Sequence, residues 1–91
     1  MQVLLHRSAE KYLNRLQPAV RDHFYAAFTD LEKEPPKGDI RPYVGNPGTF
    51  RLTVGNYRAI FKFEDNHILV THIEPRGQAY TKRTLTKRGK K

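Results

Sequence analysis

The sequence contains no cysteine and only one serine. The lack of cysteine excludes a disulfide framework and a thiolate zinc site. We expect Ser8 to cap a helix, which leaves no serine or cysteine for a nucleophilic triad. The glycines occupy turns rather than a strand-to-helix junction, which argues against a phosphate-binding loop. The histidines are scattered along the chain: His6, His23, His67 and His72. The sequence therefore predicts neither a metal site nor a cofactor.

Long apolar runs are also absent. No stretch approaches the roughly 18 residues of a membrane span, and the N-terminal segment is too short for a secretory signal. A chain of 91 residues suffices for one domain, which buries about 60% of its unfolded surface. We therefore expect one cytoplasmic domain over residues 1–81, without a membrane partner, followed by a basic tail over residues 82–91.

Acidic residues are missing from the C-terminal end. Residues 1–75 contain ten Lys or Arg and nine Asp or Glu, whereas residues 76–91 contain seven Lys or Arg and no acid. The formal charge of +8 therefore lies almost entirely in the last segment, which includes Lys82 and Arg83. A solvated tail would account for this charge. Beside a basic sheet face, however, a polyanion is the better expectation, with nucleic acid ahead of an acidic protein.

The segment from Thr49 to Tyr80 predicts three short strands, two tight turns and a final loop that carries Arg76 and Tyr80. Gly55-Asn56 is typical of a two-residue hairpin turn, because glycine accepts the positive φ that a type II′ turn requires. This turn predicts four cross-strand pairs: Val54–Tyr57, Thr53–Arg58, Leu52–Ala59 and Arg51–Ile60.

A second turn at Asp65-Asn66 predicts the next hairpin. Its expected pairs are Phe63–Ile68, Phe61–Val70, Ala59–His72 and Arg58–Ile73. In this register His72 lies on the core side, as a hydrogen-bonded core histidine. One face of the sheet is then apolar: Phe50, Leu52, Val54, Tyr57, Ala59, Phe61, Phe63, Ile68 and Val70. The other face carries Arg51, Thr53, Arg58, Lys62 and Thr71, with Ile60, Leu69 and Ile73 as its apolar members. We therefore expect a sheet with an apolar side and a cationic side.

Two amphipathic helices precede these strands. Ala9, Tyr12, Leu13 and Leu16 recur at helical spacing, Pro18 begins a second helix, and Pro35-Pro36 ends it. The apolar face of the second helix consists of Val20, Phe24, Ala27, Phe28 and Leu31. Residues 2–6 are expected as an edge strand. The predicted fold is α+β with two layers: an N-terminal helical hairpin packed on one face of a small, mainly antiparallel sheet.

Residues 37–48 are rich in proline and glycine and have neither helical nor strand periodicity. We expect a surface connection here. Lys37 and Arg41 would extend the basic surface if they face it, although a plain solvated loop is the simpler interpretation.

The remaining candidates for chemistry are cations and a phenol. Arg51 and Arg58 share one sheet face, and Arg76 and Tyr80 follow in the loop beyond it. Guanidinium groups contact phosphate oxygens in pairs and would stabilise the extra negative charge of a pentacoordinate phosphorus. RNA supplies its own nucleophile, the 2′-hydroxyl. On the residues alone, cations that only bind the RNA backbone are as good an interpretation as catalytic ones.

Three runs of sequence resemble the RelE/ParE superfamily of bacterial toxins from type II toxin–antitoxin systems, and within it the RelE-like mRNA interferases. These runs are NRLQPAVRDHFYAAFTDLEKEPPKGD, GTFRLTVGNYRAIFKFEDNHILV and IEPRGQAY. The resemblance covers about residues 1–81. Its most specific elements are the Gly-Asn-Tyr-Arg turn that ends at Arg58 and the ending from Arg76 to Tyr80.

The resemblance implies a toxin that cleaves mRNA at the ribosomal A site through the RNA 2′-hydroxyl, without a metal. Arg58, Arg76 and Tyr80 match the catalytic arginines and tyrosine of such members. Arg51 matches a basic position of the preceding strand, and Thr53 stands where a second lysine is usual. Because arginine stays protonated, this difference leaves the general base unassigned. The family also implies a cognate antitoxin, through an acidic or partly disordered segment.

Two alternatives remain within the family. ParE-type members share the fold and poison DNA gyrase without this arginine and tyrosine set. A degenerate toxin would only bind its antitoxin. Arg58, Arg76 and Tyr80 together favour the ribonuclease. In that reading Arg51, Thr53, Lys37, Arg41, Lys62, Lys82 and Arg83 bind RNA.

Overall fold

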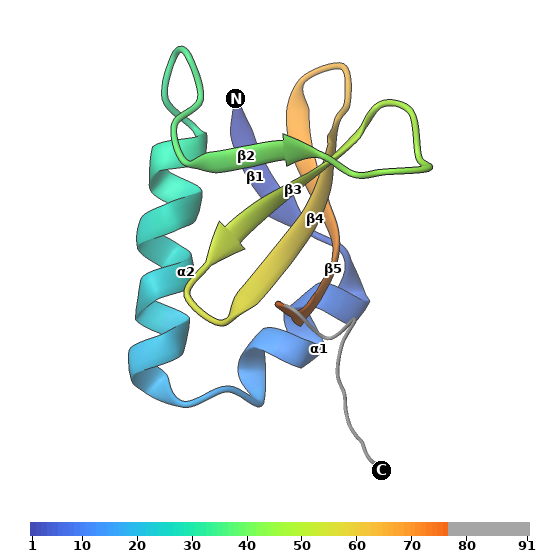
Figure 1. Ribbon diagram of the computed structural model, residues 1–91. Coiled ribbons are helices and arrows are strands. Elements are labelled where there is room, and N and C mark those ends of the chain that lie inside the picture. The colour runs from blue at the N-terminus through green and yellow to red at the C-terminus, as the bar shows by residue number, and fades with distance from the viewer. Residues whose placement is uncertain (77–91) are drawn as a thin grey trace, which may run out of the picture.

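The computed structural model describes residues 1–76 of the chain. Over these residues the chain forms one sheet and two helices, arranged as Figure 1 shows. The sheet has the strand order β1-β5-β4-β3-β2. The strands are β1 (Gln2–Leu5), β2 (Asp39–Pro42), β3 (Thr49–Val54), β4 (Tyr57–Phe63) and β5 (His67–Pro75). Neighbouring strands are antiparallel, except that β1 runs parallel to β5 at the sheet edge. The predicted α+β class and the N-terminal edge strand are confirmed.

The two helices are α1 (Arg7–Asn14) and α2 (Pro18–Leu31). Pro18 occupies the first turn of α2, where its missing N–H leaves no hydrogen bond unmade. The prediction that Ser8 caps α1 is wrong, because His6 is the cap and its Nδ1 accepts the N–H of Ser8 at 3.1 Å. The Ser8 hydroxyl instead donates to the carbonyl of Thr71, at 2.9 Å, and ties α1 to β5. Within residues 1–76, neither helix has the length and apolar character of a bilayer span.

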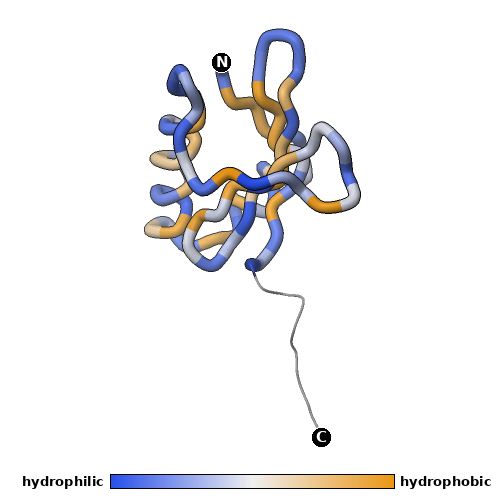
Figure 2. The backbone as a smooth tube through the Cα atoms, turned by 45° about the horizontal axis from the view of Figure 1, so that its top comes forward, coloured by the Kyte–Doolittle hydropathy of each residue, from blue (hydrophilic) through white to orange (hydrophobic). Residues whose placement is uncertain are grey.

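Both helices bury their apolar side against the same face of the sheet. Figure 2 shows alternating hydrophilic and hydrophobic bands along α2, as a helix with one buried face requires. The buried cluster joins the two helices to β3, β4 and β5 through Ala9, Leu13, Phe24, Phe28, Leu31, Leu52, Val54, Ala59, Phe61, Ile68, Val70 and Ile73. The opposite face of the sheet therefore carries no helix from residues 1–76.

The register of the first hairpin is the predicted one. Val54 pairs with Tyr57, and the ladder continues through Thr53–Arg58 to Arg51–Ile60. Gly55 has a φ of +58°, which a side chain would disfavour, so glycine is required at this turn. Arg51 and Arg58 therefore lie on the face away from the helices.

The register of the second hairpin departs from the prediction after Phe61–Val70. A β-bulge between Ile60 and Phe61 leaves Thr71 as an extra residue, so that Ile60 pairs with His72, Ala59 with Ile73 and Arg58 with Glu74. The predicted pairs Ala59–His72 and Arg58–Ile73 are wrong. The bulge brings Ile73 into the core, at 5% exposure, and keeps the imidazole of His72 out of it. The bulge therefore lets β4 and β5 remain paired while both Val70 and Ile73 are buried in the core.

The connection between α2 and β3 contains a strand that the sequence did not predict. β2 pairs with β3 over four residues, with Ile40 opposite Leu52 and Arg41 opposite Arg51. A short edge strand that ends in proline has little periodicity to reveal it, and its pairing with β3 stabilises it. Its consequence is that Arg41 joins the face that carries Arg51.

Candidate functional site

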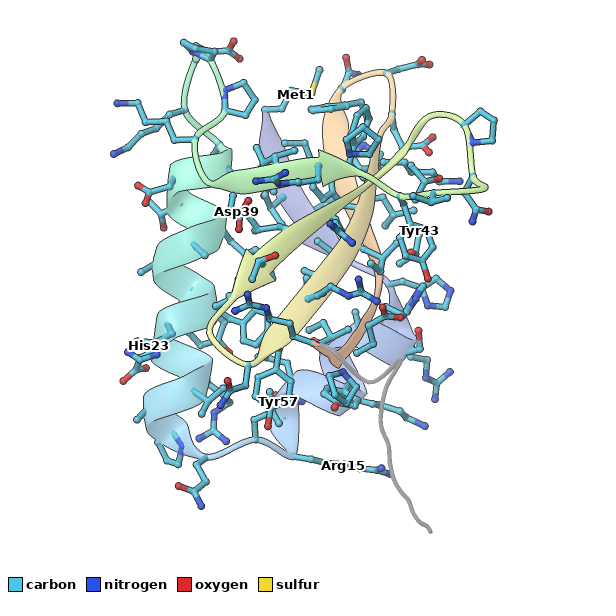
Figure 3. All side chains as sticks on the ribbon, in the orientation of Figure 1. Met1, Arg15, His23, Asp39, Tyr43 and Tyr57 are labelled. Carbon is cyan, nitrogen blue, oxygen red and sulfur yellow. The ribbon has the colours of Figure 1, made fainter. Side chains whose placement is uncertain are left out.

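The sheet face opposite the helices, here called the polar face, is defined by the register. Residues that pair across strands share a face, so the side chains of this face lie in rows that cross the sheet. One row is Asp39, Thr53, Arg58 and Glu74, and the next is Arg41, Arg51, Ile60 and His72. Lys62 and Leu69 form part of a third row. Figure 3 shows Asp39 and Tyr43 beside the two ends of β2, which borders this face.

Four of the predicted RNA-binding or catalytic residues stand together in the first two rows: Arg41, Arg51, Thr53 and Arg58. Arg58 and Arg51 are diagonal neighbours on β4 and β3. Ile60 lies between Arg51 and His72 in its row and is only 1% exposed, although it lies outside the main core cluster. Its neighbours on the polar face therefore cover it, and the polar side chains pack there rather than extend singly into solvent.

The guanidinium groups of Arg51 and Arg58 retain hydrogen-bonding capacity. The Nε atom of each is buried and has no hydrogen-bond partner among residues 1–76. An unpaired buried donor is unusual in a folded protein and is destabilising. Because Arg51 and Arg58 lie in adjacent rows, their guanidinium groups concentrate positive charge on one part of the polar face.

Glu74 is a charged member of the polar face that the sequence analysis missed. Its Oε2 forms an ion pair with Nη2 of Arg58, and its Oε1 lies 3.4 Å from Nε2 of His72. The expected face had no acid on it, because the predicted register placed Ile73 opposite Arg58. The missed signal is the spacing of Val70 and Ile73, which are three positions apart and therefore cannot both face the core in a regular strand.

The imidazole of His72 has contacts on several sides. Nδ1 lies 3.3 Å from the hydroxyl of Thr71, and that hydroxyl donates to the carbonyl of Ile60 at 3.2 Å. The ring of Tyr43 packs edge-on against it, with 6.4 Å between ring centroids. His72 therefore lies on the polar face, where these contacts fix the position of its ring, and is not the core histidine that the sequence predicted.

Arg76 lies at the turn between β3 and β4. Its backbone N–H donates to the carbonyl of Asn56 at 2.8 Å, and Nη1 lies 3.5 Å from the carbonyl of Gly55. The Tyr57–Pro75 pair separates it from the row of Arg58 by one position. Arg76 is thus fixed at the end of the polar face by backbone contacts.

The other predicted contact residues are placed differently. Lys62 lies on the polar face with its ammonium 3.5 Å from Glu64, and Arg41 has its Nε 3.4 Å from Asp39. Lys37 precedes β2, and its backbone N–H donates to the backbone carbonyl of Asp30 at the end of α2, so it is not in the rows of the polar face. Tyr80, Lys82 and Arg83 lie outside the described residues. Residues 1–76 contain no cluster of His, Asp or Glu suited to a metal ion.

The sequence from residue 3 to residue 80 matches the family described as the ParE toxin of the type II toxin–antitoxin system parDE. The chain belongs to this family. Membership confirms the RelE/ParE superfamily that the sequence analysis named. The choice of the RelE-like branch stays a prediction. No curated protein sequence matches the chain at a significant level.

Solved structures support the same superfamily. The ParE-family chain is 29% identical to a chain of the archaeal RelE–RelB complex from Pyrococcus horikoshii OT3, with a TM-score of 0.69, and the match covers 86% of this chain and 97% of that one. The RelBE2 toxin–antitoxin complex of Mycobacterium tuberculosis gives 23% identity and a TM-score of 0.70, over 82% and 96% of the two chains. The isolated E. coli RelE toxin is 15% identical to this chain with a TM-score of 0.67, and the match covers 81% of this chain and 82% of that one. The last two likenesses show a shared fold.

Tyr12 of this toxin gives a prediction about alkaline pH. Burial raises the pKa of its phenol, and Tyr57 and Glu74 raise that pKa further. The folded state therefore favours the neutral phenol. This contribution to stability is complete below the unfolded pKa near 10 and is lost as pH rises through the higher folded pKa. Between about pH 9 and pH 11, the urea midpoint of Tyr12→Phe is expected to fall less than that of the wild type. Equal decreases in both proteins would contradict this assignment.

Proposed function

We propose that the chain is an endoribonuclease that cleaves mRNA at the ribosomal A site through attack of the RNA 2′-hydroxyl on the adjacent phosphate. The observation that supports this proposal best is the grouping of Arg51 and Arg58 on the polar face, with Arg76 fixed at its end. A scissile phosphate bound there would lie among guanidinium groups that remain charged at any working pH.

The chemistry asked of these arginines is charge stabilisation. Attack by the 2′-hydroxyl adds negative charge to the phosphate oxygens in the pentacoordinate state. Preformed donors that face the developing charge lower the barrier because they need little reorganisation. Arg58 and Arg76 would hold the scissile phosphate, and Arg51 would steady the phosphate or the leaving group. Tyr80 would transfer a proton or stack on a base. The reaction needs no metal in this scheme.

The remaining basic residues have a binding role in the proposal. Arg41 extends the row of Arg51, and Lys62 adds an ammonium in the next row. Lys37, Lys82 and Arg83 would contact the RNA backbone further out. Such contacts increase affinity at low salt without selecting a sequence. A ribosome that presents mRNA in its A site would supply the substrate.

A cognate antitoxin is the proposed protein partner. The similar structures from P. horikoshii and M. tuberculosis are complexes of a toxin with its antitoxin. An acidic or partly disordered segment of an antitoxin would complement the four cations of the polar face, Arg41, Arg51, Arg58 and Lys62. Among residues 1–76, Asp39 and Glu74 offset them within the rows of the polar face, and Glu64 lies 3.5 Å from Lys62.

Inhibition of DNA gyrase is the second candidate function. It is favoured by the match to the ParE toxin family and by the ion pair that occupies Arg58. A catalytically degenerate toxin that only binds its antitoxin is the third.

One pair of assays separates these functions. The purified chain is added to ribosomes that hold a defined mRNA codon in the A site and, separately, to gyrase with relaxed plasmid. We expect a cut within the A-site codon and normal supercoiling. Inhibition of supercoiling without a cut would overturn the proposal in favour of gyrase, and inactivity in both assays would leave only antitoxin binding.

A further inference from the structure

Glu74 links two side chains of the polar face that differ in chemistry. One carboxylate oxygen pairs with the guanidinium of Arg58, and the other lies 3.4 Å from Nε2 of His72. The side chains of Arg58 and Glu74 are 21% and 23% exposed, and that of His72 is 45% exposed. A carboxylate and an imidazole therefore stand in contact beside the proposed phosphate site, with the imidazole open to solvent.

The contacts of the Thr71 hydroxyl place a proton on Nδ1 of His72. The Thr71 hydroxyl has a single proton, which it donates to the carbonyl of Ile60, so toward Nδ1 it acts as an acceptor. Nε2 lies 3.4 Å from Oε1 of Glu74, a contact that becomes an ion pair when the imidazole takes up a second proton. The pair therefore places a group that can give a proton beside a group that can accept one.

Charged and titratable side chains of several elements border the pair, including Tyr12 of α1, whose pKa Glu74 raises. Arg58 on β4 contacts Glu74, Arg51 on β3 stands across Ile60 from His72, and Arg41 on β2 follows in the same row. The ring of Tyr43 covers one edge of the imidazole. One carboxylate oxygen of Glu74 is therefore paired with the guanidinium of Arg58, and the other faces His72.

We propose that Glu74 is the general base and His72 the general acid of the RNA cleavage, an inference that rests on the proposed function. Glu74 removes the proton of the 2′-hydroxyl as the 2′-oxygen forms its bond to phosphorus. The bond from phosphorus to the 5′-oxygen breaks, and His72 gives its proton to that oxygen. The products are a 2′,3′-cyclic phosphate and a 5′-hydroxyl. The contact between the two side chains then returns the proton from Glu74 to His72.

Glu74 and His72 would provide the proton-transferring groups that the arginines cannot provide. Arg51 and Thr53 occupy the positions where the family resemblance would place lysines, and neither exchanges a proton near neutral pH. An imidazole does so readily. The sequence did not reveal the pair, because without the bulge His72 and Glu74 do not share the face of Arg58.

The variants that test the pair are Glu74→Gln and His72→Gln, with Glu64→Gln and His67→Gln as matched controls at the β4–β5 turn. Each test variant is expected to slow cleavage of ribosome-bound mRNA by about 10²–10⁴-fold, and each control by less than about threefold. The Glu64→Gln control changes the net charge by the same amount as Glu74→Gln. Glu74→Asp, which keeps the charge on a shorter side chain, is expected to lie between Glu74→Gln and the wild type.

A modified substrate distinguishes catalysis from a structural role. In an mRNA with sulfur in place of the scissile 5′-oxygen, the leaving thiolate needs no proton. His72→Gln is expected to cleave this RNA at a rate close to the wild type, whereas Glu74→Gln stays slow. The pH–rate profile gives a second readout: Glu74→Gln should lose the rise at acidic pH and His72→Gln the fall at alkaline pH.

Three results would overturn the inference alone. The first is normal cleavage by both test variants while Arg58→Ala is inactive. The second is faster cleavage by Glu74→Gln, which would make Glu74 a restraint on Arg58. The third is a His72→Gln defect that the sulfur substrate does not relieve. A wild type that cuts no mRNA would instead overturn the proposed function, and this inference with it.

Discussion

Replacement of Arg58 by alanine is expected to reduce the rate of A-site mRNA cleavage by about 10²–10³-fold, the usual effect of removing one donor that stabilises a developing oxyanion. The guanidinium is half of an ion pair with Glu74 and lies diagonally next to Arg51. Its loss would remove the charge nearest the scissile phosphate and leave Glu74 without its cation. The measurement is the single-turnover rate on ribosomes that hold a fixed mRNA.

Two matched variants make the Arg58 result specific. Arg58→Lys keeps the charge but loses the paired donors of a guanidinium, so it should recover only part of the rate. Arg15→Ala removes an arginine at the end of α1, remote from β2 in Figure 3, and should leave the rate unchanged. Arg58→Ala that cleaves as fast as Arg15→Ala would remove Arg58 from the mechanism.

Replacement of Phe61 by alanine is expected to lower the free energy of unfolding by about 3–5 kcal/mol. Phe61 is fully buried, and its ring packs against Phe50 and Phe63 at centroid distances of 5.7 and 5.6 Å. A loss of this size is a large part of the roughly 5–15 kcal/mol that stabilises a typical domain. Urea unfolding followed by circular dichroism would measure it, since the chain has no tryptophan.

Phe63 is the control for this measurement, because it lies on the same strand and remains 43% exposed. Phe63→Ala is expected to lower the free energy of unfolding by about 1 kcal/mol, since it removes less buried area. An equal decrease in the free energy of unfolding for both variants would contradict the assignment of Phe61, and not Phe63, to the buried core.

The first hairpin and the helix faces were predictable from local rules. Gly55-Asn56 defined a two-residue turn, and alternation from that turn placed Arg51 and Arg58 on one face. Pro18 marked the start of α2, because proline fits a first helical turn and little else in a helix. In these segments, each residue's conformation follows from near neighbours in the chain.

The pairing of Glu74 was not predictable from alternation alone. A bulge shifts all later residues to the other face, and it forms here because Ile73 gains burial in the core and the Thr71 hydroxyl bonds Ile60. These are tertiary contacts, and the alternation of residues along one strand gives no information about them. The same holds for β2, whose strand conformation comes from pairing with β3.

Replacement of one ribose tests most directly whether the polar face cuts RNA through its own 2′-hydroxyl. Two mRNAs are compared on the ribosome with the wild-type chain: one entirely of ribose, and one with a single 2′-deoxynucleotide on the 5′ side of the scissile phosphate. We expect the first mRNA to be cut, with a 2′,3′-cyclic phosphate at the new end, and the second to stay intact. Equal cleavage of both mRNAs, or of neither, would contradict this expectation.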